Sequence, residues 1–201
     1  MRSQTIALAA AGLLIGAGIA LIGTSGPHAP ATSGTIVTGK PSVGGPFTLL
    51  DHTGKRVTEK DFLGRNTLVF FGFTNCPDIC PSGLQVMTAA LDKLGAKADS
   101  VTPVFITLDA ARDTPEKLAQ YLKSFHPRLI GLTGSAEEVA AAAKAYRVYY
   151  QKVTDEKSPQ SYSYDHSAIF YLMGKDGAFI SPIQHTTDVD ALVKSLSAAL
   201  P

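Results

Sequence analysis

The chain has 201 residues, of which 45% are hydrophobic and 17% are charged, and its 18 Lys and Arg residues nearly balance its 17 Asp and Glu residues. A nucleic-acid-binding domain usually carries a basic patch or stripe, so this composition excludes nucleic acid as an expected partner. The length suits one folded domain with a sizeable core, preceded by a shorter N-terminal region.

The N-terminal region contains an apolar stretch that predicts a membrane anchor. No charged residue occurs from Thr5 to Gly23. A helix of about 20 such residues, rising about 1.5 Å per residue, spans a hydrocarbon core of about 30 Å. In Ala29-Pro30-Ala31, the nearest small-residue site, proline disfavours cleavage. We therefore expect residues 1–25 to remain as a single-pass transmembrane helix.

The charges around this predicted anchor set its expected orientation. Arg2 precedes the anchor, and the next basic residue is Lys40, which places the N-terminus in the cytoplasm. The segment lacks the Arg-rich amphipathic character of an organelle transit peptide, which favours a bacterial source. We therefore expect a bacterial inner-membrane protein whose remaining chain faces the periplasm.

Residues 26–45 are rich in Gly, Pro, Ser, Thr and Ala, and they predict a flexible tether to a folded domain at 46–201. Strand and helix patterns alternate along this domain. We predict strands at 47–50, 56–58, 67–73, 101–108, 130–132, 168–173 and 178–182. We predict helices at 81–94, 115–125, 136–146 and 188–200.

The helix predictions rest on residue spacing and on capping residues. Leu84, Met87 and Leu91 are three and four positions apart, which is the spacing of one helical face. Thr114 precedes a proline and Ser135 precedes an acidic pair, and both are typical N-caps. The order of elements is that of a thioredoxin-like α/β domain, so we expect a central mixed sheet flanked by helices.

Cys76 and Cys80 are the only cysteines, and they lie between the predicted strand 67–73 and the predicted helix 81–94. Two thiols this close favour a soft-metal site or a redox pair over a structural disulfide, because disulfide stabilisation grows with loop length. A helix N-terminus lowers the pKa of a nearby thiol. The three-residue spacer is longer than that of thioredoxin-type oxidoreductases, so the two sulfurs can lie farther apart and bind one metal ion between them. A disulfide between the two cysteines is also compatible with this spacing.

Two thiolates leave a copper or zinc ion short of ligands, and the five histidines are the candidates for a third. Three of them are expected to be solvated surface residues: His28, His52 and His126. His185, near the predicted last helix, is ambiguous. His166 follows a polar, Tyr-rich segment, 161–165, that we predict to be a loop, and it precedes the strand 168–173. A lone histidine there is more often structural than a ligand, so the residues alone leave both roles open.

Four signatures occur in order along the domain. They are FGFTNCPDICP (71–81), TLD (107–109) with RDTPE (112–116), GLTG (131–134) with AYRVYY (145–150), and DHS (165–167) with FYL (170–172) and GKDG (174–177). In these signatures the chain resembles the Sco/SenC family of membrane-anchored copper-delivery proteins. The resemblance implies a thioredoxin-like fold, a domain facing the periplasm, and one copper ion bound by Cys76, Cys80 and His166.

The resemblance also implies a client and further partners. The family's usual client is the dinuclear copper centre in subunit II of a haem-copper cytochrome c oxidase. Two thiolates and one imidazole suit Cu(I), with Cu(II) as a second form to test. A periplasmic copper donor and a thiol reductant are further expected partners.

An alternative from the enzyme class uses the same residues. Cycling of Cys76 and Cys80 between dithiol and disulfide would make the chain a thiol-disulfide oxidoreductase that reduces the oxidase cysteines. A peroxiredoxin-like peroxidase is disfavoured, because the expected proline and threonine placement is missing around Thr74; a redox or copper sensor stays open. His166 separates the first two hypotheses, because only copper needs an imidazole ligand, and we favour a metallochaperone over an enzyme.

Overall fold

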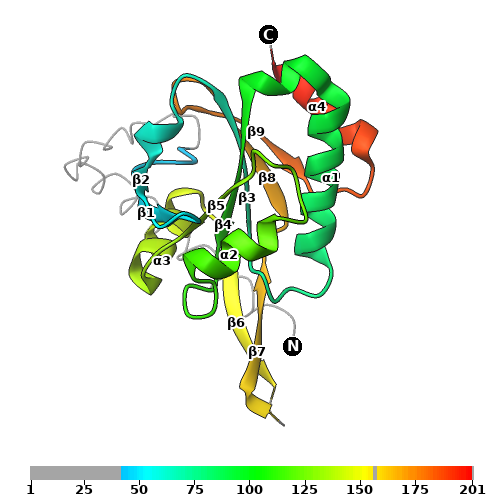
Figure 1. Cartoon of the computed structure of the whole chain (residues 1–201). Coiled ribbons are helices and arrows are strands. Elements are labelled where there is room, and N and C mark those ends of the chain that lie inside the picture. The colour runs from blue at the N-terminus through cyan, green and yellow to red at the C-terminus, as the bar shows by residue number, and fades with distance from the viewer. Residues whose placement is uncertain (1–41, 156–157, 201) are drawn as a thin grey trace, which may run out of the picture. The chain divides into compact units, whose positions relative to one another are not determined.

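The computed structural model describes residues 42–155 and 158–200. The strands are β1 (Thr48–Asp51), β2 (Arg56–Thr58), β3 (Asn66–Gly72), β4 (Val101–Thr107), β5 (Ile130–Thr133), β6 (Tyr150–Asp155), β7 (Ser158–His166), β8 (Ile169–Met173) and β9 (Phe179–Gln184) (Figure 1). The helices are α1 (Ile79–Leu94), α2 (Pro115–Leu122), α3 (Ala136–Ala145) and α4 (Val189–Ala199), with short 3-10 helices at Glu59–Phe62 and Gly95–Ser100.

The main sheet has seven strands in the order β2-β1-β5-β4-β3-β8-β9. β3, β4 and β5 are parallel, whereas β8 pairs antiparallel with both β3 and β9. Parallel neighbours need a crossover, and α1 and α2 supply it between successive parallel strands. These features confirm the predicted central mixed sheet flanked by helices.

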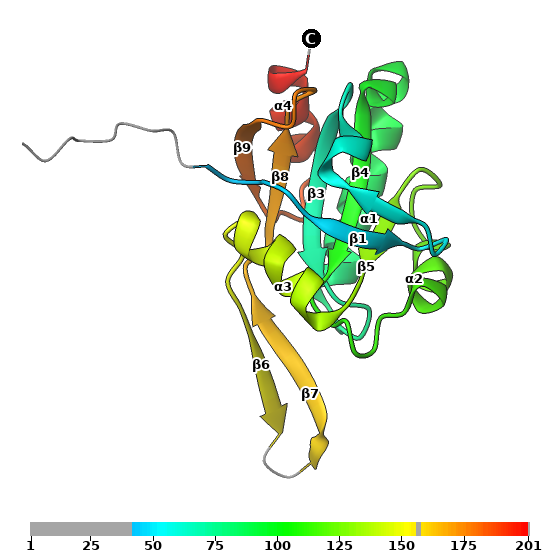
Figure 2. The ribbon, with the colours of Figure 1, turned by 90° about the vertical axis from the view of Figure 1, so that its left-hand side faces the viewer.

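The two faces of the main sheet are covered by different helices. Alternate residues of β3 point to opposite faces, as in any strand. Leu68 and Phe70 belong to a buried cluster with α1, α2 and α4, whereas Val69 and Phe71 pack with α3. Figure 2 shows α3 on one side of the sheet and α1 on the other. Cys80 is part of the first cluster, so the cysteine pair belongs to the α1 face.

Helix α1 begins at Ile79, two residues before the predicted start at residue 81. Proline has no N–H to donate, but the first four N–H groups of a helix have no acceptor within the helix. Pro81 is therefore tolerated as the third helical residue. The consequence is that Cys80 lies within the first turn of the helix and not in the loop that precedes it.

The prediction of a loop at 161–165 is wrong, because this segment lies within strand β7. β6 and β7 form a separate antiparallel sheet, which projects from the body of the domain (Figure 1). Tyrosine alternates with serine here, which is the period of a strand, and tyrosine favours strands. His166 is the last residue of β7 and lies opposite Tyr150.

The predicted transmembrane helix, residues 1–25, and most of the predicted tether lie outside the described residues. In the part of the chain that the structure describes, no helix is both long enough and apolar enough to cross a membrane. The backbone N–H of Gly44 donates to Ala145 O at 2.9 Å, and Arg147 Nε donates to Ser42 O at 3.0 Å. Residues 42–44 therefore lie against the end of α3.

Candidate functional site

The two cysteines meet where strand β3 gives way to helix α1. Cys76 is half-buried in the connecting loop, and Cys80 is fully buried. The backbone N–H of Cys80 donates to Cys76 Sγ at 3.4 Å. Gly72, the last residue of β3, leaves room for this arrangement, because a Cβ there would lie 2.7 Å from Cys80 Sγ.

The imidazole of His166 reaches the same place from the end of β7. Its Nε2 is 3.6 Å from Cys80 Sγ, and its Nδ1 is 3.1 Å from the carbonyl oxygen of Ser167. A carbonyl oxygen can only accept, so Nδ1 carries the proton of the neutral ring and Nε2 keeps a free lone pair towards the sulfur. The ring also packs edge-on against Phe73, with centroids 5.9 Å apart.

The sulfurs of the pair differ in charge. A hydrogen bond from the Cys80 thiol, with further bonds from the backbone N–H groups of Asp78 and Cys80, holds the pKa of Cys76 far below its usual range despite partial burial. The neighbouring Cys76 sulfur and burial raise the pKa of Cys80 above its usual range. At neutral pH the pair therefore consists of a Cys76 thiolate and a Cys80 thiol.

These three side chains lie close together but do not yet surround a common point. Within residues 42–155 and 158–200, no group of three His, Cys, Asp or Glu side chains already has the spacing of a metal-ligand shell. A shared ion would therefore require small rotations of the side chains. The structure brings together all three residues that the sequence nominated for the site.

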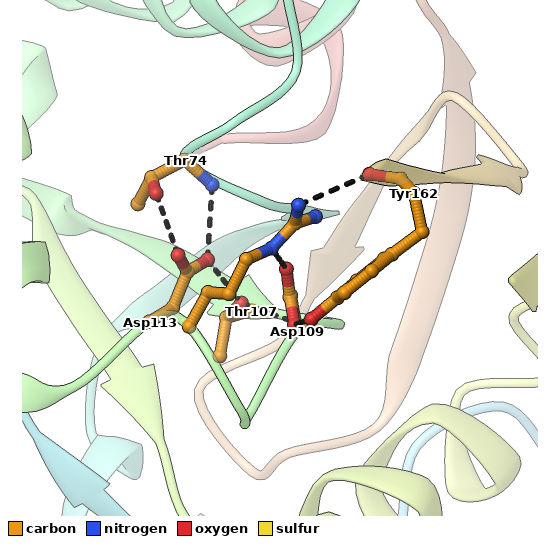
Figure 3. A network of polar contacts seen from close by, with 6 residues as sticks. Thr74, Thr107, Asp109, Asp113 and Tyr162 are labelled. Carbon is orange, nitrogen blue, oxygen red and sulfur yellow. Dashed lines mark hydrogen bonds and ion pairs between the residues drawn. The ribbon is translucent and has the colours of Figure 1, made fainter. Parts of the chain in front are cut away.

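The loop that carries Cys76 is tied to the sheet by a buried carboxylate that the sequence reading missed. Asp113 is fully buried, and it accepts hydrogen bonds from the Thr74 N–H (2.9 Å), the Thr74 hydroxyl (2.5 Å) and the Thr107 hydroxyl (2.6 Å). Figure 3 shows these contacts converging on the carboxylate. The RDTPE signature contains Asp113, but the sequence alone does not show which residues hydrogen-bond to its carboxylate.

Two of the other histidines are less exposed than predicted. His126 was expected at the surface, but its side chain is only 10% exposed. Its Nδ1 accepts the backbone N–H of Arg128 at 3.2 Å. His52 is half-buried, and its Nδ1 accepts the backbone N–H of Gly131 at 3.1 Å. In each histidine the ring nitrogen Nδ1 accepts a hydrogen bond from a backbone N–H, so both histidines have a structural role.

The contacts of His185 are those of a packing residue. His185 follows β9, stacks on Phe70 and Phe170, and has its Nε2 3.3 Å from Ser82 Oγ. These contacts assign it to the packing between β9 and α1. His28 lies outside the described residues.

Comparison with known proteins supports a single family. The SCO1/SenC family model matches residues 36–200. The mitochondrial SCO1 homolog 1 of Arabidopsis thaliana is 48% identical over 155 residues, which are 77% of this chain and 46% of that protein. The chain spans about half the length of the curated relatives it matches.

Solved structures agree with the sequence relatives. The structure of Bradyrhizobium japonicum ScoI with copper bound is 42% identical and has a TM-score of 0.72, covering 79% of this chain and 99% of that one. BsSco, described as a Sco-family cytochrome c oxidase assembly protein with a disulfide switch, is 27% identical with a TM-score of 0.61, covering 79% of this chain and 93% of that one. The family match, the identities and the shared fold together lead to one conclusion: the chain belongs to the SCO1/SenC family.

Proposed function

We propose that this protein binds one copper ion through Cys76, Cys80 and His166 and hands it to another protein. The observation that carries the proposal is the meeting of two cysteine sulfurs and an imidazole lone pair. A bound metal lies about 2.3 Å from a sulfur ligand and about 2.0 Å from a nitrogen ligand. With a tetrahedral to trigonal S–metal–N angle, the sulfur and the nitrogen are then about 3.6 Å apart. Cys80 Sγ and His166 Nε2 are 3.6 Å apart.

The donor set favours Cu(I) as the cargo. Thiolate sulfur is a soft ligand that selects Cu(I), and imidazole also suits copper. Binding requires the Cys80 thiol to lose its proton, because the thiolate is the ligand. Cys76 is half-buried, so an incoming ligand from another protein has access to this side of the site. The Bradyrhizobium relative, whose structure has copper bound, supports copper as the cargo.

The expected client is the dinuclear copper centre in subunit II of cytochrome c oxidase. Support comes from the family and from BsSco, which is described as a cytochrome c oxidase assembly protein. In this proposal residues 1–25 anchor the protein in the bacterial inner membrane, and the domain faces the periplasm. A copper donor and a thiol reductant would act there to load the site.

A second candidate function is thiol-disulfide exchange with the oxidase cysteines. It is favoured by the direct contact between the two cysteines and by the low pKa of Cys76, since a thiolate is the attacking species in disulfide exchange. The disulfide switch described for BsSco also supports it. This function uses Cys76 and Cys80 but gives no role to the His166 lone pair.

Replacing His166 by alanine separates the two functions, because it removes a copper ligand and leaves both thiols. We expect purified His166→Ala protein to bind Cu(I) more than about 100-fold more weakly in competition with a chelator, because loss of a ligand costs more than the about 10- to 100-fold that loss of an outer partner costs. In cells lacking the wild-type gene, it should fail to restore oxidase activity at limiting copper. His52→Ala is the matched control and should restore activity.

Cys76→Ser completes the experiment, because both functions need this sulfur. It should fail in either case, which verifies that the assay depends on the site. Full restoration of oxidase activity by His166→Ala, together with failure of Cys76→Ser, would refute copper delivery and leave thiol reduction as the better account.

A further inference from the structure

The arm that carries His166 is not part of the main sheet. β6 and β7 pair only with each other among the described strands. No ladder of backbone hydrogen bonds therefore fixes the hairpin against β3, where the cysteine loop begins. The position of the His166 ring relative to Cys80 must depend on the chain connection at its base and on side-chain contacts along the hairpin.

The most polar of these contacts is a closed ring of three residues, Asp109, Arg112 and Tyr162, which we call the clasp (Figure 3). Tyr162 Oη donates to Asp109 Oδ1 at 2.9 Å, and Arg112 Nε forms an ion pair with Asp109 Oδ2. Arg112 Nη1 donates to the backbone carbonyl oxygen of Tyr162 at 3.0 Å. The guanidinium carbon of Arg112 also lies 3.7 Å from the centroid of the Tyr162 ring.

The clasp is anchored to the same buried point as the cysteine loop. The Asp109 side chain is fully buried, and its backbone N–H donates to Thr107 Oγ1 at 2.9 Å. The Thr107 hydroxyl in turn donates to Asp113, the carboxylate that holds Thr74. The two arms of the site, one bearing Cys76 and the other bearing His166, are thus tied to one polar cluster at the end of β4.

We propose that the clasp positions His166 for copper binding by holding the β6–β7 hairpin against the end of β4. Tyr162 and His166 lie on the same face of β7, because strand residues four apart share a face. Fixing Tyr162 therefore fixes the approach of the imidazole to Cys80. This inference rests on the proposed function, and it makes Asp109, Arg112 and Tyr162 positioning residues that do not touch the metal.

Two substitutions test the clasp at different strengths. Tyr162→Phe removes only the hydrogen bond from the hydroxyl to Asp109 and leaves the ring beneath Arg112. Arg112→Met removes the ion pair, the hydrogen bond to Tyr162 O and the guanidinium over the ring, where Lys152 Nζ remains 3.6 Å from the centroid. It also leaves the buried Asp109 carboxylate without its cation. Tyr149→Phe is the matched control, because Tyr149 is 55% exposed and its hydroxyl donates to Gln151 on the hairpin itself.

Cu(I) affinity of the full-length protein should be measured by chelator competition in the wild-type and His166→Ala backgrounds. We expect Arg112→Met to weaken binding at least about tenfold when His166 is present, and Tyr162→Phe to weaken it by less, as for other outer partners of metal ligands. Neither substitution should alter affinity in the His166→Ala background, since the imidazole is already gone. Equal losses in both backgrounds would overturn the proposal, because the clasp would then act through the fold or the cysteines.

A second readout needs no copper. In the copper-free protein, the NMR signal of the His166 Cε1–H should shift or broaden in Tyr162→Phe, and it should not change in Tyr149→Phe. An unchanged signal in both clasp variants overturns the proposal. If the wild-type protein binds no Cu(I), the proposed function fails, and the His166 signal alone decides whether the clasp positions the ring.

Discussion

Asp113 offers a quantitative test of how the cysteine loop is held. Its buried carboxylate accepts three hydrogen bonds, from the N–H and hydroxyl of Thr74 and from the hydroxyl of Thr107. Asp113→Ala leaves all three donors without this acceptor; the Thr107 hydroxyl is buried, and the two Thr74 donors are part-buried. The hydroxyls can rotate towards other acceptors, but the N–H cannot. A donor left without an acceptor costs about 1–3 kcal/mol, and each of the two lost hydroxyl bonds costs about 1 kcal/mol, so we expect a total loss of about 3–5 kcal/mol in unfolding free energy.

Asp113→Asn should cost much less, because an amide can satisfy the same donors. Its oxygen can take the place of Oδ2, which accepts from both the Thr74 N–H and the Thr107 hydroxyl. Its NH2 group then faces the Thr74 hydroxyl, which can turn to accept. Only the additional strength that the charge gives to these hydrogen bonds is lost, and we expect the unfolding free energy to fall by about 1–2 kcal/mol.

Urea unfolding followed by circular dichroism measures both changes. Asp99→Ala is the control, because the Asp99 side chain is 81% exposed and its nearest cation lies 3.8 Å away. We expect the control to change stability by no more than about 0.5 kcal/mol. A loss below about 1 kcal/mol for Asp113→Ala would refute the reasoning. Equal losses for the alanine and asparagine variants would refute it too.

Two further predictions concern the sulfurs. Gly72→Ala places a methyl group 2.7 Å from Cys80 Sγ and 2.9 Å from the Phe105 ring. It should lower the unfolding free energy measured in urea by about 1–3 kcal/mol and weaken Cu(I) binding. Wild-type stability and wild-type Cu(I) affinity would contradict this packing. Because the pKa of Cys76 is strongly lowered, its alkylation by iodoacetamide, followed by peptide mapping, should stay nearly constant from pH 8 to about pH 6. A tenfold slowing per pH unit would indicate an ordinary thiol.

Much of the fold follows from local sequence patterns, because each predicted element carried its own signal. Thr114 and Ser135 cap α2 and α3 as predicted, with side chains that accept from backbone N–H groups three residues later. That Cys76 and Cys80 lie where β3 gives way to α1 also follows from the sequence, since an apolar run, a short loop and a helical pattern stand in that order. The site's cysteine half was therefore predictable from the residues.

The histidine half was not predictable in this way, because it depends on contacts between distant segments. Asp109 and Tyr162 are 53 residues apart, and their hydrogen bond helps to hold a hairpin that the polar sequence made look like a loop. His126 was misjudged for the same reason, since its backbone partner is not visible in the sequence pattern. For His166 only the family resemblance indicated a role, and the structure supplied the 3.6 Å approach to Cys80.

The two halves of the candidate site are attached to the fold by different means. Cys80 belongs to the first turn of α1, and the Cys76 loop is held through a backbone N–H by a buried carboxylate. His166 lies on a hairpin outside the main sheet, tied by side-chain contacts. Releasing either half breaks hydrogen bonds to a buried carboxylate, Asp109 for the hairpin and Asp113 for the cysteine loop, so both halves are held in place without copper. A copper carrier needs His166 held beside the sulfur pair, while a thiol reductase needs only the pair, so this arrangement favours the carrier.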